Sequence, residues 1–199
     1  MENKTYTGHV LLVMAPTGSG KGTLERYVLA KFPEIKFAVS CTTRRPRPNE
    51  KAGVDYHYIS SEIFHEKIVE GKFLEWAEFS GNLYGTLKAE LLDSLESGQL
   101  VINEIELQGI EQIKKIIPAQ NLTIVYIDAG DWSAMERRAL GRAPLTEDEV
   151  AMRQARYEHE VAAKPFADIV IDNCDGRLEE AKKEFTSVVE NILHNIATT

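Results

Sequence analysis

A glycine-rich segment between a strand-like run and a helical pattern constrains the fold of this chain more than any other feature. The apolar run Val10–Met14 leads into Ala15-Pro16-Thr17-Gly18-Ser19-Gly20-Lys21-Gly22-Thr23, and helical spacing starts at Leu24. Glycines let successive backbone N–H groups converge on an anion, and the N-terminus of the helix adds positive partial charge. The segment therefore predicts a phosphate-binding loop in which Lys21 places its charge between the phosphates of a nucleoside triphosphate.

This segment departs from the phosphate-loop consensus at two positions. Ala15 stands where the consensus opens with Gly, and Gly22 stands where it has Ser or Thr, so Thr23 becomes the hydroxyl candidate for a magnesium ion. The alternative is an ordinary strand, turn and helix. The Gly-x-Gly-Lys-Gly-Thr core favours the phosphate loop, and we take residues 15–23 as candidate ATP contacts.

Strand-like apolar runs alternate with segments of helical spacing, which predicts an α/β fold with a mainly parallel sheet flanked by helices. The runs are Val10–Met14, Phe37–Val39, Leu100–Ile105, Thr123–Ile127 and Ile169–Ile171. The helical segments are Leu24–Lys31, Ser61–Glu70, Leu87–Ser97, Gly109–Ile116, Trp132–Leu140, Thr146–Val161 and Leu178–Ile196. A chain of 199 residues suits one domain with elaborations.

Two segments, residues 40–86 and 131–164, interrupt the alternation of strands and helices. Inserts at the carboxyl ends of parallel strands lie where ligands bind. We expect a P-loop core of residues 1–39, 87–130 and 165–199, a small mixed insert of residues 40–86, and a helical lid of residues 131–164. In the lid, Thr146 and the acids that follow it predict a capped helix that carries Arg153 and Arg156. An arginine-bearing helix can close over a phosphate site.

Composition narrows the class of partner. The 23 Lys and Arg against 31 Asp and Glu give a net charge of −8, which argues against general affinity for nucleic acid or an anionic membrane. The first residues lack an apolar signal core, and no run approaches the roughly 20 apolar residues that cross a bilayer, so we expect a cytoplasmic protein. Cys41 and Cys174 are expected to be reduced thiols.

Three arginines, Arg44, Arg45 and Arg47, crowd into four positions of this acidic chain around Pro46. Guanidinium groups so closely spaced suit a phosphate dianion. Pairing of the arginines with Glu50 and Asp55 in a solvated loop is the equally weighted alternative.

The segment Ser40-x-Thr-Thr-Arg-x-Pro-Arg-x-x-Glu50, followed by Gly53-x-Asp-Tyr-x-Tyr58, resembles the nucleotide-acceptor segment of guanylate kinases. The loop beginning Ala-Pro-Thr-Gly is similar to theirs, and residues 73–86, FLEWAEFSGNLYGT, resemble the stretch that reads guanine. The resemblance continues more loosely through Arg142 and Arg153 to residues 169–173, so it covers nearly the whole chain.

The resemblance implies transfer of the ATP γ-phosphate to GMP or dGMP with Mg²⁺, giving ADP and GDP or dGDP. It implies that the acceptor phosphate is held by Ser40, Arg44, Arg47, Tyr56 and Tyr84, with Glu50 in the same segment, and that Glu75 and Thr86 read the base. The catalytic candidates are Lys21, Arg47, Arg142 and Arg153, with Arg138 a weaker addition. Either Asp172 or Asn173 is expected beside the adenine.

Guanine chemistry agrees with these roles. A carboxylate such as Glu75 can accept from the N1–H and the exocyclic amine together, and Thr86 can donate to O6, whereas adenine shows the opposite pattern. Taken alone, Glu75 reads as a surface strand residue, Tyr56 and Tyr84 as half-buried packing, and Arg142 and Arg153 as helix-surface partners of Glu147, Glu149 or Glu158.

The clearest departure from the family lies at Glu104 and Glu106, where guanylate kinases usually carry aspartates. Both remain candidates for guanine contacts, and Glu104 with Thr23 for the metal. Each glutamate adds a methylene, and a misplacement of about 1 Å can cost on the order of a hundredfold in rate.

Two alternatives stay open beside an active kinase: a catalytically weak guanylate-kinase-like module that binds a phosphorylated ligand, and a small-molecule kinase with a different acceptor. The retained phosphate loop weighs against the first, and Glu75, Tyr84 and Thr86 weigh against the second. We expect small-molecule partners only, GMP or dGMP and ATP, and a monomer or homodimer.

Overall fold

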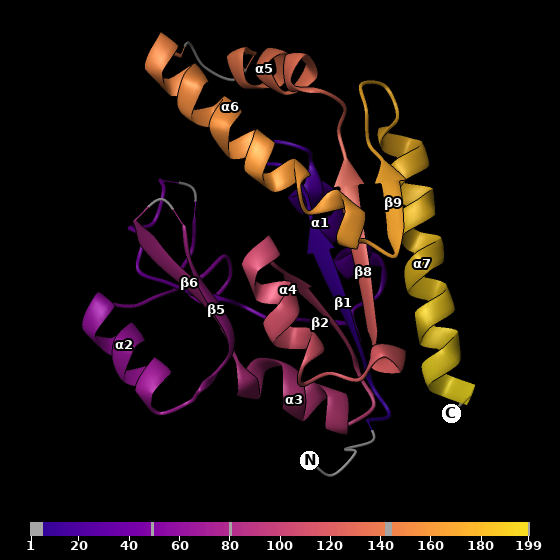
Figure 1. The fold of residues 1–199 in the computed structure, drawn as a ribbon. Helices are drawn as coiled ribbons and strands as arrows, with labels where there is room; N and C mark the ends of the chain where they lie inside the picture. The colour runs from indigo at the N-terminus through magenta and orange to yellow at the C-terminus, as the bar shows by residue number, and fades with distance from the viewer. Residues whose placement is uncertain (1–5, 49, 80, 142–144, 199) are drawn as a thin grey trace. The chain divides into compact units, whose positions relative to one another are not determined.

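In the computed structural model, residues 6–48, 50–79, 81–141 and 145–198 are described (Figure 1). The chain divides into two compact units. Unit 1 comprises Met1–Leu11 and Glu34–Leu122, and unit 2 comprises Leu12–Pro33 and Thr123–Thr198. The division passes through β1 (His9–Met14), so that this strand belongs to both.

Unit 2 carries the glycine-rich loop and the charged segment of residues 131–164. After β1 its elements are α1 (Lys21–Lys31), β8 (Leu122–Asp128), α5 (Trp132–Leu140), α6 (Glu147–Val161), η2 (Lys164–Phe166), β9 (Ile169–Asp172) and α7 (Leu178–Thr198). Strands β8 and β9 pair in parallel, with Val125 opposite Ile169. Helix α7 packs against β9 and α1, and α5 contacts α6 (Figure 1).

Unit 1 contains a second, mixed sheet and the helices that pack on it. Its elements are β2 (Lys36–Phe37), β3 (Cys41–Thr42), β4 (His57–Tyr58), α2 (Ser61–Val69), β5 (Phe73–Phe79), β6 (Asn82–Leu87), α3 (Lys88–Glu96), β7 (Leu100–Glu104), α4 (Leu107–Lys114) and η1 (Ala119–Asn121). The mixed sheet has the order β4-β3-β6-β5, with β3 and β4 parallel and the other pairs antiparallel.

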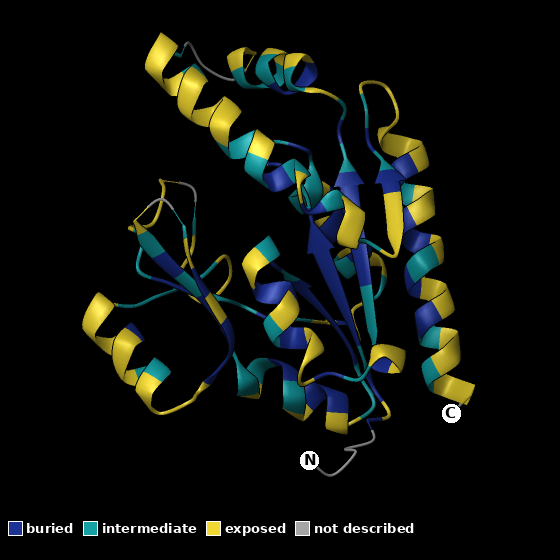
Figure 2. Ribbon diagram, viewed as in Figure 1, coloured by how far each residue is buried: buried dark blue, intermediate teal, exposed yellow. Residues whose placement is uncertain are grey.

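The larger sheet has the strand order β2-β7-β1-β8-β9. Parallel pairing joins β2 to β7 and β8 to β9, and the helices on its faces let strands such as β1 be buried over nearly their whole length. Figure 2 shows this buried centre in dark blue, in contrast with the exposed outer turns of α6. This arrangement confirms the predicted α/β class with a mainly parallel sheet.

The predicted elements agree with the structure except at a few ends. Helix α1 begins three residues earlier than the apolar spacing indicated, because the first turn after Gly20 contains Lys21 and Gly22. Strand β2 ends at Phe37 and not at Val39, although the N–H of Ala38 still donates to the Ile102 carbonyl. The capped helix expected after Thr146 is confirmed by a reciprocal capping box with Glu149. Cys41 and Cys174 are free thiols, as expected.

A small apolar cluster holds α2 against the mixed sheet. Phe64 is fully buried, and its ring stacks on Phe73 with centroids 4.3 Å apart. Cys41 and Leu83 complete the buried part of the cluster. The mixed sheet therefore has a core of its own, which orients β5 and β6.

Replacing Phe64 by alanine is expected to lower the free energy of unfolding by about 3–5 kcal/mol, because the ring leaves a cavity. Val69 lies on the same helix but is 88% exposed. Val69→Ala is therefore the matched control and should change stability by less than about 0.5 kcal/mol. Urea denaturation of both variants measures the difference, and equal stabilities would contradict a separate core at α2.

Candidate functional site

The glycine-rich loop has the backbone geometry of an anion site. Gly18 and Gly20 adopt φ angles of 95° and 90°, which side-chain-bearing residues rarely adopt. Gly20 is the N-cap of α1 without a side-chain cap, and the first turn of α1 contains no acidic residue. The N-terminus of α1 therefore keeps its positive partial charge for a ligand.

Two side chains hold the middle of this loop, Asn173 after β9 and Arg138 on α5. The buried Asn173 amide donates from Nδ2 to the Ser19 carbonyl at 2.7 Å, and Arg138 donates from Nη1 to the same oxygen at 3.3 Å. Arg138 also donates to the Asn173 carbonyl and to Asp175. Because a Cβ on Gly20 would lie 2.6 Å from Asn173 Nδ2, the loop needs glycine there.

The start of the loop is hydrogen-bonded to helix α6. Thr17 donates its backbone N–H to Glu160 Oε2 at 2.7 Å and its hydroxyl to Glu160 Oε1 at 2.8 Å. Glu160 lies near the C-terminal end of α6 and is buried. The loop is thus fixed both at Thr17 and at Ser19.

Of the two arginines predicted for the lid, Arg153 lies among the described residues, on helix α6. Arg153 is exposed on it, and two of its alternative partners, Glu149 and Glu158, accept hydrogen bonds from Thr146 and Gln154 instead. Arg142, the other predicted lid arginine, lies outside the described residues.

In unit 1, Glu50 organises the arginine segment. Arg44 donates from Nη2 to both carboxylate oxygens at 2.8 and 3.0 Å, the Arg47 N–H donates at 2.8 Å, and Tyr58 donates its hydroxyl at 2.8 Å. Burial opposes the charge, but these hydrogen bonds outweigh it and hold the pKa of Glu50 at about 2. Asp55 accepts from the Lys51 N–H, so of the two acids it is Glu50 that pairs with the arginines.

Three of the predicted acceptor-phosphate residues lie together beside this carboxylate. The Arg44 guanidinium lies 5.5 Å from the centre of the Tyr56 ring, and Tyr84 contacts Tyr56 edge-on with centroids 6.0 Å apart. Arg47 is different, since its side chain is 62% exposed and its Nη1 lies 3.9 Å from Glu50. Arg44 is therefore held in place, while the Arg47 guanidinium extends into solvent.

Glu75 and Thr86, the predicted base readers, are cross-strand neighbours on β5 and β6. Thr86 donates its hydroxyl to Glu75 Oε1 at 2.7 Å, and both residues are buried. Ser40 Oγ lies 3.2 Å from Thr86 Oγ1, with either hydroxyl able to donate. The structure thus brings together three predicted substrate residues in one polar cluster.

Asn103 of β7 completes this cluster and was not singled out in the sequence. It is fully buried, donates from Nδ2 to the Ala38 carbonyl at 3.2 Å, and places Oδ1 3.3 Å from Thr86 Oγ1. A polar residue inside the apolar run Leu100–Ile105 was the signal that could have found it.

The first turn of α4 makes room for the Glu75 carboxylate. A Cβ on Gly109 would lie 2.6 Å from Glu75 Oε2 and 2.9 Å from the Ile105 side chain. Burial, together with the negative charge of Glu106 at the N-cap of α4, raises the pKa of Glu75 to about 7, against the hydrogen bonds from Thr86. This carboxyl group therefore titrates near neutral pH.

The remaining predicted metal and substrate residues lie at element ends. Thr23 is exposed in the first turn of α1, and Glu104 is half-buried at the end of β7. Hydroxyl and carboxylate oxygens are the hard ligands that Mg²⁺ prefers, usually one or two of them together with substrate phosphates. No group of three or more His, Cys, Asp or Glu side chains among the described residues forms a metal site by itself.

Asp172 and Asn173 end β9 in different environments. Asn173 is buried against the phosphate loop, whereas the Asp172 side chain is 43% exposed, accepts from the Cys174 N–H and pairs with Arg177.

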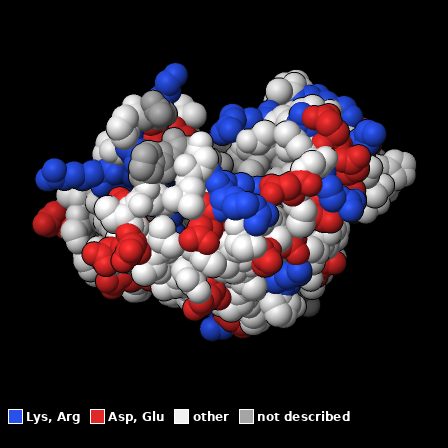
Figure 3. Space-filling model, turned by 90° about the horizontal axis from the view of Figure 1, so that it is seen from above, with Lys and Arg blue, Asp and Glu red and all other residues white. Residues whose placement is uncertain are grey.

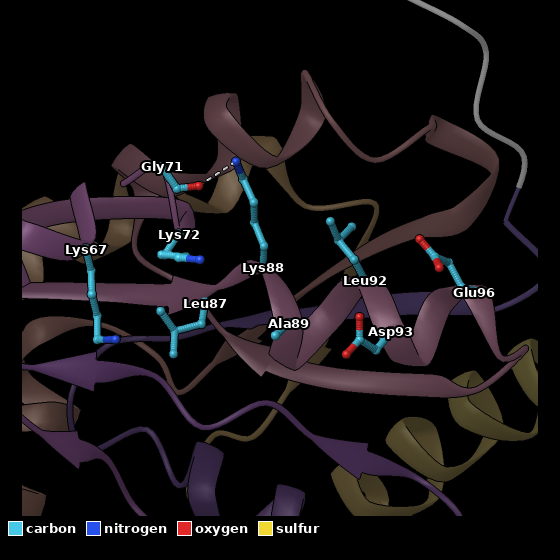
Figure 4. A pocket seen from close by; sticks show the side chains of 9 residues that line it. All are labelled: Lys67, Gly71, Lys72, Leu87, Lys88, Ala89, Leu92, Asp93 and Glu96. Carbon is cyan, nitrogen blue, oxygen red and sulfur yellow. Dashed lines mark hydrogen bonds between the residues drawn. The ribbon is translucent and has the colours of Figure 1, made fainter. Parts of the chain in front are cut away.

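A pocket of about 350 Å³ opens in unit 1 along α3, between that helix and residues from Lys67 to Lys72 (Figure 4). Lys88 and Gly71 both line it, and Lys88 donates to the Gly71 carbonyl at 2.7 Å. The other lining residues are Lys67, Lys72, Leu87, Ala89, Leu92, Asp93 and Glu96. None of the predicted site residues lines it, so it is not part of the candidate site.

Charged side chains of both signs are interspersed on the face drawn in Figure 3, and neither sign covers it among the residues described there. Each helix in the described ranges is too short or too polar to cross a bilayer.

Comparison with known proteins identifies the family. The family model described as "Guanylate kinase" matches residues 7–192. The guanylate kinase of Rubrobacter xylanophilus is 41% identical over 186 residues, which are 94% of this chain and 95% of that protein. That of Thermosynechococcus vestitus is 41% identical over 168 residues, 84% of this chain and 87% of that protein. The crystal structure of guanylate kinase from Anaplasma phagocytophilum shares the fold, with a TM-score of 0.72 at 23% identity over 94% of this chain and 87% of that one.

A glycine-rich phosphate loop between β1 and α1, set in a mainly parallel sheet flanked by helices, defines a P-loop α/β protein. Within this class the matched relatives are nucleotide kinases. The chain belongs to the guanylate kinase family, a family of nucleoside monophosphate kinases. The resemblance noted in three separate sequence blocks is thereby confirmed.

The acid stability of unit 1 is expected to depend on Glu50. Its pKa falls from 4.5 to about 2 on folding, so its contribution is present above about pH 4.5 and is lost as the pH falls toward 2. Glu50→Gln should therefore lower the stability at pH 7 and flatten the loss between pH 4.5 and 2. Urea midpoints across that range measure it, with Asp55→Asn as the control in the same segment. Parallel curves for wild type and Glu50→Gln would contradict this account.

Proposed function

We propose that this chain transfers the γ-phosphate of ATP to GMP or dGMP, giving ADP and GDP or dGDP. The observation that carries the proposal is the buried Glu75–Thr86 pair, which offers a carboxylate acceptor and a hydroxyl donor side by side. The phosphate loop of unit 2 supports ATP as the donor. Membership of the guanylate kinase family agrees with both.

The proposed recognition of guanine depends on which hydrogen bonds Glu75 can accept and which one Thr86 can donate. Glu75 can accept from the N1–H and the amine of guanine, and those donors free the single Thr86 proton to turn toward O6. Adenine offers an acceptor at N1, which would leave the buried carboxylate facing a lone pair. An unpaired buried acceptor costs about 1–3 kcal/mol or more, and this penalty supports guanine selectivity.

Phosphoryl transfer requires positioning and neutralisation of charge, with little covalent work by the protein. We assign the donor phosphates to the loop of residues 15–23, through the backbone N–H groups that the loop does not already use in its own hydrogen bonds, and to Lys21. Arg44 is held ready for the acceptor phosphate together with Ser40, Tyr56 and Tyr84. Arg47 and Arg153, both exposed, are assigned to the charge that spreads over the transferring group, as is Arg142.

Magnesium, when bound with ATP, would neutralise phosphate charge, and Thr23 and Glu104 supply oxygen ligands of the right kind for it. Glu106 stays a candidate guanine contact beside Glu75. Since Asn173 is engaged with the loop, we assign the adenine side to Asp172.

We further propose the division into a core of residues 1–39, 87–130 and 165–199, an acceptor insert of residues 40–86 and a lid of residues 131–164. The separate apolar core under the mixed sheet supports the insert. The capped, largely exposed helix α6 supports the lid. We place the protein in the cytoplasm, as a monomer or homodimer with small-molecule partners.

ADP formation from Mg-ATP should be measured with GMP, dGMP, AMP, UMP and CMP supplied separately, and the phosphorylated product identified directly. Turnover with the guanine nucleotides alone is the expected result. Silence across the panel with GMP binding retained would replace this proposal by a phospho-ligand binding module. Turnover with another acceptor would move Glu75 and Thr86 out of base reading.

Lys21→Ala is expected to lower kcat by at least about a hundredfold, because a charge on the transferring phosphates is lost. Lys31 lies at the other end of α1, where it pairs with the exposed Glu190. Lys31→Ala is thus the matched control and should stay within about twofold of wild type. Wild-type turnover in Lys21→Ala would contradict the phosphate-loop assignment.

The KM for GMP should depend on pH through Glu75. The pKa of Glu75 is raised to about 7 and guanine needs the ionised form, so the KM should rise as the pH falls below 7, by up to about tenfold per unit. The phosphate of GMP also titrates, near pH 6. Glu75→Gln keeps that second titration and should lose the one near 7, while GMP selectivity over IMP and AMP falls. Identical pH profiles would remove Glu75 as the base reader.

A further inference from the structure

The last turn of α6 carries a buried carboxylate that no motif of the sequence pointed to. The Glu160 side chain is 6% exposed, and its two oxygens accept separate hydrogen bonds from the backbone and the hydroxyl of Thr17, at 2.7 and 2.8 Å. Bonds to an ionised acceptor are shorter and stronger than neutral ones. Thr17 stands at the start of the phosphate loop, one residue before the first positive-φ glycine.

A carboxylate beside a phosphate loop is unfavourable for an anionic ligand unless its charge is balanced. Arg156, one turn earlier on the same helix, donates from Nε to Glu160 Oε1 at 2.7 Å. The pair brings little net charge to the loop, and it satisfies the carboxylate that burial would otherwise penalise. The contribution of Glu160 is therefore to fix the conformation of the loop at Thr17, without changing the net charge beside it by much.

The loop needs this order because its glycines are free to adopt many backbone conformations. Gly18 and Gly20 flank Ser19, whose carbonyl is held by Asn173 and Arg138. Apart from Glu160, the start of the loop is supported by its own turn, in which the Ser19 N–H donates to the Pro16 carbonyl. Amides that point at a ligand before it arrives bind it at a lower entropic cost.

Glu160 also joins the loop to the arginine that we assign to the transferring phosphate. Arg153 precedes Glu160 by seven residues on α6, which places the two about 10 Å apart along one face of the helix. The end of α6 that carries Glu160 is therefore hydrogen-bonded to the loop, on the same helix as Arg153.

We propose that Glu160 is a positioning residue that orders the phosphate loop through Thr17 and anchors α6 to it, so that the loop and Arg153 act together. The proposal rests on the proposed kinase function for its kinetic consequence only. Glu160 itself touches no substrate phosphate in this scheme.

The test compares Glu160→Ala with Glu158→Gln, a control two residues away on the exposed part of α6, where Glu158 accepts from Gln154. Glu160→Ala should raise the KM for ATP by about tenfold or more and lower kcat, because bonds to a charged acceptor are lost. The KM for GMP should stay within about twofold, and Glu158→Gln should match wild type. An equal rise in both KM values with a lowered Tm would show a general structural role and overturn the proposal.

A second variant guards against a simple failure of Glu160→Ala to fold. Thr17→Val keeps the shape of the side chain and removes only the hydroxyl donor to Glu160. It should show a smaller rise in the KM for ATP, and combining it with Glu160→Ala should add little. Fully additive effects would overturn the coupling between the two residues.

Amide hydrogen exchange in the protein without nucleotide separates this proposal from the proposed function. Exchange at Thr17 should be about tenfold faster or more in Glu160→Ala and unchanged in Glu158→Gln. If wild type fails to phosphorylate guanine nucleotides while Thr17 exchange still responds, the kinase function fails and the ordering role stands. If wild type is active and neither Thr17 exchange nor the KM for ATP changes, the ordering role is wrong.

Discussion

A phosphate loop must leave some of its backbone N–H groups for a ligand, so atoms outside the loop have to help hold its shape. A regular strand or helix would use those amides internally, and a glycine-rich turn has no side chains with which to brace itself. In unit 2, side chains from outside the loop provide the hydrogen bonds that hold it. Asn173 and Arg138 hold the Ser19 carbonyl, Glu160 holds Thr17, and the elements that carry them come from distant parts of the sequence.

Unit 1 uses two carboxylates in opposite ways. Glu50 receives hydrogen bonds from Arg44, Arg47 and Tyr58 and stays ionised under all ordinary conditions. Glu75 is buried, receives hydrogen bonds from fewer donors and lies beside the negative charge of Glu106. Its pKa is therefore raised to about 7. The first carboxylate therefore stays charged and holds the arginine segment in place, whereas the second can exist in either protonation state near neutral pH.

The class of fold could be read from the sequence because buried parallel strands and amphipathic helices leave periodic traces. The capping box at Thr146 was equally readable, since its residues are three apart. The blocks around Arg44 and Glu75 pointed to the candidate site through their resemblance to a family. Asn103 was visible as one polar residue in an apolar run, but its partners Ala38 and Thr86 were not. Glu160 left no local signal, because it meets Thr17 across 143 residues of chain.

Gly109 shows how a site can set a limit on the stability of the helix that borders it. Glycine in the interior of a helix costs about 0.5–1 kcal/mol relative to alanine, and Gly109 in the first turn of α4 has a smaller cost of the same kind. The missing methyl group is the space in which the Glu75 carboxylate lies. Replacing Gly109 by a larger residue to raise the melting temperature would therefore involve a trade-off, because the gain in helix stability is set against loss of the space that the Glu75 carboxyl group occupies.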